Sequence, residues 1–252
     1  MKKNVGIVLL ANRRYLIYFE KIYNDLRNVG KFTGDIVLLT DYKTNCSSVK
    51  KFNDNKLFIK RFKKIKYPFL INKQLNKIKY GRNKSKSFQW QKLYLFHEYF
   101  KKWDHIFYLD INMKVKNDIN PLINLEFSNT LYAPYDAYPD LDWKLKSQFD
   151  EKNIYINTLS KQYDLENPRY FQTGILFFDT NIIEKNTLEN LLSLVKKFPI
   201  SKNNEQGILN LYFLYDFPIF KRLPVKINDY ITYSYWDDNN KNVIITKKNR
   251  NL

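Results

Sequence analysis

Residues 5–40 read VGIVLLANRRYLIYFEKIYNDLRNVGKFTGDIVLLT, and this stretch decides the fold class. Its apolar runs at 5–10 and 35–40 do not alternate with polar residues, which is typical of strands covered on both faces. The residues between them predict an amphipathic helix, because five apolar side chains recur at helical spacing: Tyr15, Phe19, Ile22, Tyr23 and Leu26.

Polar and glycine signals mark the two ends of this helix. Asn12 is placed to cap its start, and Gly30 to end it. Strand, helix and strand in about 35 residues form a βαβ unit, which predicts parallel strands joined by a right-handed crossover.

The same alternation continues to about residue 220. We expect further strands at 57–59, 104–110, 130–134 and 174–178, and helices at 87–101, 188–198 and 204–215, the last capped by Asn203 or Asn204. The fold class is therefore α/β, with a Rossmann-like, mostly parallel central sheet and helices on both faces. Without an internal repeat or a linker, we expect one domain over 1–252, with the polar, aromatic stretch 137–169 as an insertion over one face.

Composition excludes several classes of protein. The chain has 252 residues, 17% of them aromatic, which argues against disorder, and its single cysteine, Cys46, rules out a disulfide scaffold. The net charge is +18, with cations concentrated at 56–86. Two interpretations stay open: the codon bias of an AT-rich genome, or a patch that faces nucleic acid, lipid headgroups or another anion.

The first strand also imitates a signal peptide, because Lys2 and Lys3 precede an apolar run. That run is short, and Asn12, Arg13 and Arg14 follow where a cleavage site needs small residues. With no run of roughly 20 apolar residues for a membrane span and one unpaired cysteine, we expect a cytoplasmic protein.

Ligands of open α/β sheets bind beyond the carboxyl ends of the strands. Three segments follow such ends: 11–15, 110–112 and 135–136. A carboxylate there, such as Asp110 or Asp136, can coordinate a hard cation or accept hydrogen bonds from sugar hydroxyls, although an acid at a strand end also forms turns and caps.

Several blocks now resemble glycosyltransferase family 8, whose members have the GT-A nucleotide-sugar transferase fold. YLDINMKV at 108–115 with DINPL at 118–122 is similar to the "YLDxDxxV…DLxPL" block of that family. QKL at 91–93, YFQTGIL at 170–176, NEQGILN at 204–210 and LP at 223–224 with Asn228 follow the family's other blocks in order.

The resemblance implies a UDP-sugar as the donor substrate. Tyr15 would stack on the base, while Ala11 and Asn12 line the edge of the base. Asp110, with Asn112 as the second member of the DxD-like motif, would contact ribose or a metal, and Lys92 would offset the diphosphate charge. Tyr15 as the first core residue of its helix, and Lys92 as one more exposed lysine, are the structural alternatives.

The resemblance also implies the residues that would carry catalysis. Asp136 would accept hydrogen bonds from the donor sugar, Gln172 and Gln206 would face it, and Glu205 stands where the family has aspartate. The alternatives are a simple turn at Asp136 and ordinary polar contacts near a helix start for the others. The insertion would border the site for a glycan or protein acceptor, with Tyr138 and Trp143 beside carboxylates, or would be a lid packed by Trp143.

The metal motif departs from the family pattern. Asn112 replaces the second acid, and Thr246 stands where the family has a histidine ligand, which weakens the case for Mn²⁺ or Mg²⁺. His97 on a helix stripe and His105 at a strand start are expected in core or surface roles. Basic residues can stabilise a departing diphosphate instead; the candidates are Lys92, Lys247, Lys248 and Arg250.

The resemblance therefore implies a glycosyltransferase that moves a sugar from a nucleotide-sugar donor, with retention of configuration. The alternative is a catalytically degenerate transferase fold that acts as a basic module for anions or nucleic acid, of which nucleic acid is the less expected partner. A sugar nucleotidylyltransferase is disfavoured, because no glycine-rich loop follows the first strand.

Overall fold

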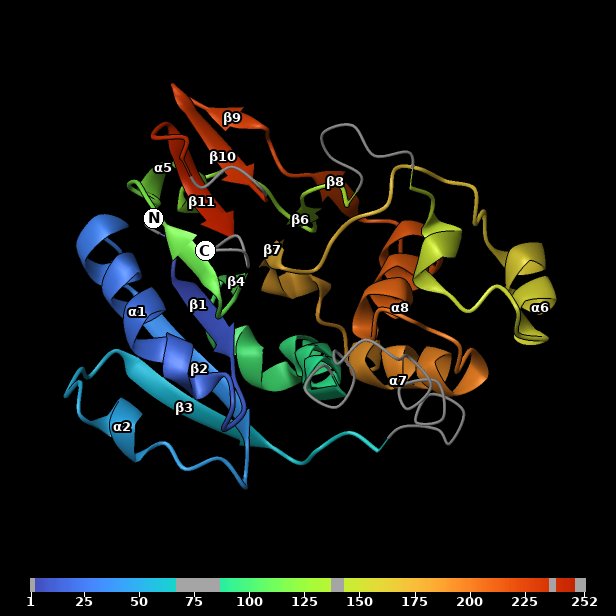
Figure 1. The fold of residues 1–252 in the computed structure, drawn as a ribbon, viewed down its shortest axis with the longest axis horizontal. Helices are drawn as coiled ribbons and strands as arrows, with labels where there is room; N and C mark the ends of the chain where they lie inside the picture. The colour runs from blue at the N-terminus through green and yellow to red at the C-terminus, as the bar shows by residue number, and fades with distance from the viewer. Residues whose placement is uncertain (1–2, 67–86, 137–142, 236–238, 248–252) are drawn as a thin grey trace.

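A seven-stranded sheet forms the centre of the molecule. The computed structural model describes residues 3–66, 87–136, 143–235 and 239–247. Within them the strand order is β3-β2-β1-β4-β7-β6-β8 (Figure 1). The bounds are β1 Val5–Leu10, β2 Asp35–Asp41, β3 Leu57–Phe62, β4 His105–Asp110, β6 Leu131–Ala133, β7 Ile175–Asp179 and β8 Phe220–Arg222.

Only β7 runs against its neighbours in this sheet of described strands. The pairs β1–β2, β2–β3, β1–β4 and β6–β8 are parallel, whereas β4–β7 and β6–β7 are antiparallel. The predicted α/β class with a mostly parallel central sheet is therefore confirmed.

Apolar layers cover both faces of the sheet. Ile7 and Leu9 of β1 point into one layer and Val8 and Leu10 into the other, because successive side chains of a strand alternate. The first layer includes α1 (Phe19–Asn24), α2 (Ser47–Lys50) and α5 (Asn120–Ile123); the second includes α6 (Tyr155–Gln162), α7 (Thr187–Lys197), α8 (Glu205–Leu211) and the segment 88–100. Each fully buried aliphatic or aromatic side chain stabilises the fold by ~1.5–3 kcal/mol.

A second, smaller sheet lies beside the first and has the order β5-β11-β10-β9 (Figure 1). The antiparallel pairing of β11 with β5 sets Thr246 opposite Lys114 and Lys247 opposite Met113. The last described strand is thereby brought next to the turn that follows β4. The bounds are β5 Met113–Val115, β9 Lys226–Ile227, β10 Tyr230–Ser234 and β11 Val243–Lys247.

The prediction of one α-helix at 87–101 is wrong. The segment forms two 3-10 helices, Ser87–Phe96 and Glu98–Lys102. They are separated at His97, which is extended and accepts a hydrogen bond from the Tyr99 amide. In the first of them, side chains as different as Trp90 and Lys92 are both buried, so it has no single apolar stripe of the kind that stabilises an amphipathic α-helix.

One more helix-end prediction is corrected, whereas two are confirmed: Asn12 accepts hydrogen bonds from the amides of Arg14 and Tyr15, and Gly30 is the residue at which its helix ends. Gly30 ends its helix in a right-handed conformation, and the left-handed residue is Lys31, at φ 52°. Glycine is needed at position 30 because a Cβ atom would lie 2.9 Å from the Leu26 carbonyl oxygen. Asn204 takes the N-cap position of α8, but its side chain makes no capping bond.

The described part of the stretch 137–169 packs into the main core. Leu145, Phe149 and Leu159 are fully buried there, whereas Trp143 is 44% exposed, so Trp143 does not pack this segment down as a lid. Tyr138, with the rest of 137–142, lies outside the described residues.

Candidate functional site

The carboxyl ends of β1 and β4 bring the first predicted residues together. Leu10 pairs with Asp110 across the two parallel strands, so Ala11 and Asn12 continue beside Asp110 at the same sheet edge. The Asp110 amide donates to the Gly174 carbonyl at 2.8 Å, which fastens the segment before β7 to this edge.

A lysine–carboxylate cluster, made of Lys92, Asp110, Thr173 and Glu205, occupies the interior of the site. The Lys92 ammonium lies 2.7 Å from Glu205 Oε1 and 3.4 Å from Asp110 Oδ1, and it donates to the Thr173 carbonyl at 2.8 Å. Its side chain is only 2% exposed. The alternative of one more exposed lysine is therefore wrong.

Mutual attraction keeps Lys92 and Asp110 charged. Burial lowers the pKa of Lys92, but the carboxylates of Asp110 and Glu205 more than compensate, so the pKa is raised. Burial raises the pKa of Asp110, while Lys92, Lys247 and the Tyr108 hydroxyl bring it below its usual value. The Tyr108 hydroxyl donates to Asp110 Oδ1 at 2.8 Å.

A second group, the Asp136 amide network, consists of Asp136, Gln148 and Gln206. Gln206 Nε2 donates to Asp136 Oδ2 and to Gln148 Oε1, each at 3.0 Å, and Gln148 Nε2 donates to Asp136 Oδ2 at 3.3 Å. Burial raises the pKa of Asp136 despite these bonds. The Thr173 amide donates to Gln206 Oε1 at 3.3 Å, which joins this network to the lysine–carboxylate cluster.

Several buried polar atoms in or next to these groups have no hydrogen-bond partner among the described residues. They include Gln172 Nε2, Glu205 Oε2 and the Tyr233 hydroxyl. Gln172 Oε1 accepts from the Gly174 amide, and a Cβ atom on Gly174 would lie 2.7 Å from that oxygen. An unsatisfied buried donor is costly unless a ligand or water pairs with it, so Gln172 is suited to receive a hydroxyl or phosphate oxygen.

The first βα turn, residues 11–15, lies at the same sheet edge. The described contacts include no hydrogen bond from this turn to the lysine–carboxylate cluster or to the Asp136 amide network. Ala11 is fully buried, and its backbone bonds to the Leu39 carbonyl and the Thr40 hydroxyl. Tyr15 is half-buried and packs against the core layer of α1. The assignments of Ala11, Asn12 and Tyr15 to a base therefore stay predictions.

The residues around Asp110 do not fit a divalent cation. Asn112 is neutral, Thr246 is a buried hydroxyl side chain, and the described residues contain no group of three acids, histidines or cysteines placed to hold a metal. Two ammonium groups already flank Asp110, with Lys247 Nζ 4.0 Å from Oδ2. Like charges repel by about 4 kcal/mol per pair of unit charges at 4 Å and a dielectric constant of about 20.

Neither histidine lies in the site. His105 is buried at the start of β4 with its ring against Phe127, and His97 is half-buried at the break between the 3-10 helices. Their predicted core and surface roles are confirmed.

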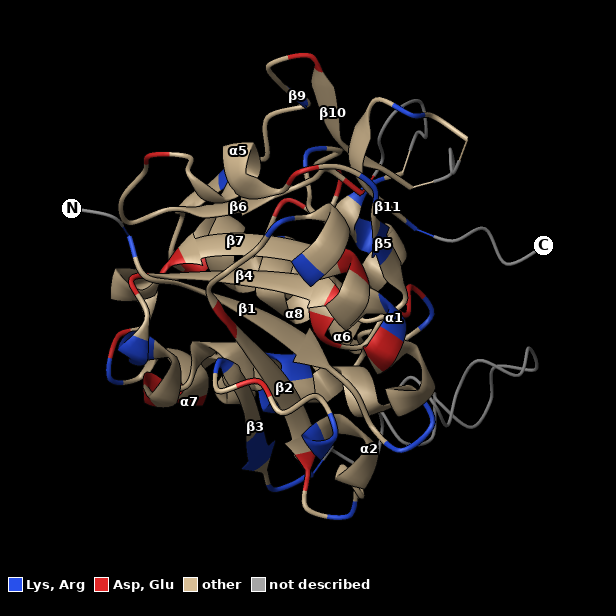
Figure 2. Ribbon diagram, turned by 90° about the vertical axis from the view of Figure 1, so that its left-hand side faces the viewer, with Lys and Arg blue, Asp and Glu red and all other residues tan. Residues whose placement is uncertain are grey.

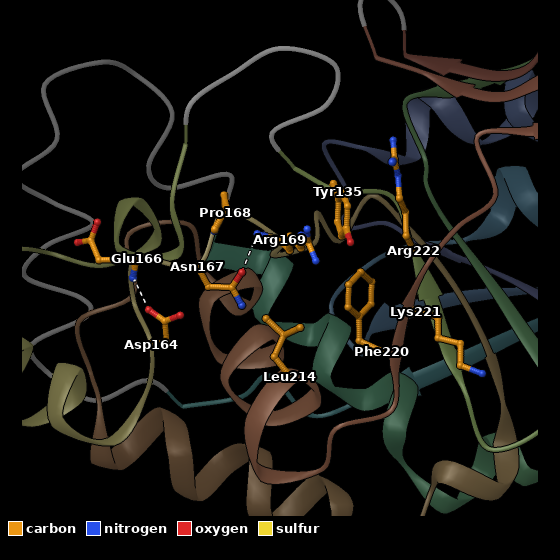
Figure 3. Close-up of a pocket in the computed structure, with 10 residues that line it drawn as sticks. All are labelled: Tyr135, Asp164, Glu166, Asn167, Pro168, Arg169, Leu214, Phe220, Lys221 and Arg222. Carbon is orange, nitrogen blue, oxygen red and sulfur yellow. Dashed lines mark hydrogen bonds between the residues drawn. The ribbon is translucent and has the colours of Figure 1, made fainter.

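An open cavity of about 660 Å³ is lined by Tyr135, the residue before Asp136 (Figure 3). Tyr135 and Arg169, the chain neighbours of Asp136 and Tyr170, line it together with Phe220 and Arg222 of β8. The Arg222 guanidinium lies 4.8 Å from the centre of the Tyr135 ring. Asp164 and Glu166 line the opposite side, so carboxylates and cations share this cavity with exposed aromatic surface.

The basic stretch 56–86 is described only up to residue 66. The Lys60 ammonium lies 4.1 Å from the centre of the Tyr99 ring, and Arg61 donates to the carbonyls of Asp41 and Thr44. Elsewhere in the described chain, Lys and Arg are interspersed with Asp and Glu (Figure 2). Lys73 and the other cations of 67–86 lie outside the described residues.

Sequence reasoning missed three members of the site. Thr173 stands inside a quoted motif, and Gln148 inside the stretch assigned to the insertion, but neither carries a signal of its own. Tyr235, whose hydroxyl accepts from Lys247 at 2.6 Å, has no motif around it.

The sheet order and the polar residues at its carboxyl edge define a nucleotide-sugar transferase architecture of the GT-A type. Solved glycosyltransferases share it. The galactosyltransferase LgtC, in complex with donor and acceptor sugar analogues, matches 96% of this chain and 86% of its own, with a TM-score of 0.64 and 12% identity. Mouse xyloside xylosyltransferase 1 matches 100% of this chain and 99% of its own, with a TM-score of 0.57 and 10% identity.

The sequence profile described as "Glycosyl transferase family 8" matches residues 6–249, and the chain belongs to this family. Galactinol synthase 2 of Arabidopsis thaliana is 26% identical over 134 residues, which are 51% of this chain and 38% of the synthase. The bifunctional glycosyltransferase WbbM matches 98% of this chain at a TM-score of 0.65 and 15% identity, and the chain spans 46% of its length. Among the described residues, none of the helices is long and apolar enough to cross a membrane.

Proposed function

We propose that this protein transfers a sugar from a UDP-sugar to a glycan or protein acceptor with retention of configuration. One observation carries the proposal: the Asp136 amide network is joined through Thr173 and Lys92 to Asp110 at the carboxyl end of β4. Amides and a carboxylate can orient sugar hydroxyls, and a carboxylate at this edge can bind ribose. The family supports the nucleotide-sugar donor.

The chemistry that follows can be stated in bonds. The bond between the anomeric carbon and the β-phosphate oxygen breaks, and its electron pair stays on that oxygen. An acceptor hydroxyl attacks the same face of the short-lived, oxocarbenium-like sugar. Its proton passes to the departing diphosphate, because on that face the departing oxygen is the nearest base.

Within the chain, each group has a separate task in this proposal. Asp136, Gln206 and Gln172 hold the sugar hydroxyls. Glu205 fixes Lys92 and Thr173, and thereby the backbone that presents Gln172. Asp110 orients the ribose, and the aromatic face of Tyr15 receives the base. The acceptor enters from the cavity lined by Tyr135 and Phe220.

A donor screen tests the proposal. Purified protein is incubated with UDP-, GDP- and TDP-sugars, and release of the nucleoside diphosphate is measured. We expect release from a UDP-sugar, loss of release in Asp136→Asn, and normal release in the exposed control Asp229→Asn. The anomeric configuration of the released sugar, read early by NMR, is expected to match the donor. No release from any nucleotide sugar, or an inverted product, would contradict the proposal.

A further inference from the structure

The side chain of Lys247 is built into the site by the smaller sheet. Because β11 pairs antiparallel with β5, Lys247 stands opposite Met113, three residues after Asp110. Thr246 before it is fully buried, whereas the Lys247 side chain is 17% exposed. The strand β11 therefore places the partly exposed Lys247 side chain at the sheet edge where β4 ends with Asp110.

Two contacts hold the Lys247 ammonium in place. It donates to the Tyr235 hydroxyl at 2.6 Å and lies 4.5 Å from the centre of the Tyr235 ring. Its nitrogen is 4.0 Å from Asp110 Oδ2, which is close enough for attraction and too long for a hydrogen bond. Since an ammonium has three N–H donors, donors are left for an anionic ligand.

Lys92 is not equally available. Its ammonium is almost fully buried and is bound to Glu205, Asp110 and the Thr173 carbonyl. The buried Lys92 neutralises the carboxylates of Asp110 and Glu205. Lys247, which is partly exposed to solvent, lies near the other oxygen of Asp110. A metal ion at Asp110 would have to approach both ammonium groups, whereas a diphosphate would be attracted by Lys247.

We propose that Lys247 binds the donor diphosphate. Its positive charge would take the place of a divalent cation, which needs a second carboxylate where this chain has Asn112. This inference builds on the proposed function and adds that donor binding and transfer need no metal. When the bond to the sugar breaks, charge grows on the β-phosphate oxygen, and the Lys247 N–H groups stabilise it.

The test compares UDP and uridine binding by calorimetry, in EDTA and in excess Mn²⁺. For the wild-type protein we expect equal UDP affinity in both. Lys247→Met should weaken UDP binding by about tenfold or more, and uridine binding by no more than about twofold, because uridine lacks the phosphates. Lys247→Arg should keep UDP affinity within about threefold. Lys226→Met, at an exposed lysine on β9 of the same sheet, should behave as wild type.

The outcomes separate the two proposals. If wild-type protein binds no UDP under either condition, the proposed function fails and this inference fails with it. If UDP binds only with Mn²⁺, or if Lys247→Met binds UDP as wild type does, only the role of Lys247 is overturned. Circular dichroism of each variant confirms that it is folded.

Discussion

At the scale of a single residue, Lys92 is both part of the buried interior and part of the candidate site. Its ammonium is the only cation that the described contacts place between Glu205 and Asp110. A buried charge whose partner is removed is far more costly than an exposed one. Lys92 therefore stabilises the folded state, and it holds Asp110 and Thr173 in place through direct contacts.

Lys92→Met should lower the free energy of unfolding by about 3–5 kcal/mol, because it leaves two carboxylates without their cation. The measurement is urea denaturation. The double variant Lys92→Met/Glu205→Gln should recover part of the lost free energy of unfolding, because one of the two unpaired carboxylates is then neutral. Lys21→Met is the control, since Lys21 pairs with Asp25 at the exposed surface and should change stability by about 0.5 kcal/mol or less. A loss below about 1 kcal/mol for Lys92→Met would show that the cluster does not depend on its lysine.

Asp136 gives a prediction about pH. Burial raises its folded-state pKa above the ordinary value of 3.8. The folded protein then holds this proton more tightly than the unfolded chain, so stability from Asp136 is present below pH 3.8 and is lost as pH rises through the folded pKa. Asp136→Asn keeps an oxygen for Gln148 and Gln206 but carries no titrating group.

We therefore expect the Tm of Asp136→Asn, relative to wild type, to be higher at pH 8 than at pH 4, while transfer activity is lost at both. Differential scanning calorimetry at the two pH values checks this. A relative Tm that falls between pH 4 and pH 8 would mean that Asp136 is stabilised as the carboxylate.

At the scale of elements, the cavity of Figure 3 is lined by Tyr135, which follows β6, by the segment 164–169, by Leu214 after α8, and by β8. Phe220 of β8 stacks on Phe171 at 4.7 Å between ring centres, and Tyr135 lies 6.0 Å from Phe220. Such aromatic faces suit the CH faces of a sugar ring. The cavity and the Asp136 amide network share neighbouring residues, which is what an acceptor site beside a donor sugar requires.

Tyr135→Ala should reduce transfer to an acceptor saccharide by about tenfold while leaving hydrolysis of the UDP-sugar within about twofold. The reason is that water needs no aromatic surface to react. The assay follows both products in one reaction with a panel of free mono- and disaccharides. Tyr42→Ala, at a 66% exposed tyrosine remote in sequence from the cavity residues, is the matched control. Equal loss of hydrolysis and transfer would place Tyr135 in the donor site instead.

The elements also show which sequence patterns predict secondary structure correctly and which do not. Apolar runs such as 5–10 and 35–40 predicted their strands closely, because a parallel strand buried on both faces has a plain sequence pattern. The segment 87–101 was predicted as the wrong kind of helix, because Trp90 and Lys92 are both buried and the partners of Lys92 come from distant parts of the chain. Asn204 failed as a cap since its conformation, φ 57°, is set by the surrounding structure.

At the scale of the whole molecule, the positive charge can now be assigned in part. The formal net charge of +18 includes cations that the protein uses internally, such as Lys92, Arg61 and Lys60. Motifs placed Asp110, Gln172, Glu205 and Gln206 at strand and helix ends, and the structure brings all four together. No pattern in the sequence could show that Lys247 reaches Asp110, because that contact depends on the register between β11 and β5.

The measurement that tests the central claim most directly is the melting temperature with and without UDP. At UDP concentrations of about 100 Kd, binding stabilises the folded state by about 2.7 kcal/mol, which corresponds to a rise of roughly 5–10 °C for a chain of this size. We predict this rise for wild type and for Tyr18→Ala, an exposed neighbour of Tyr15, and its loss in Tyr15→Ala and Asp110→Asn. No rise with UDP in the wild-type protein, or an undiminished rise in Asp110→Asn, would contradict a UDP-sugar site at the carboxyl edge of the sheet.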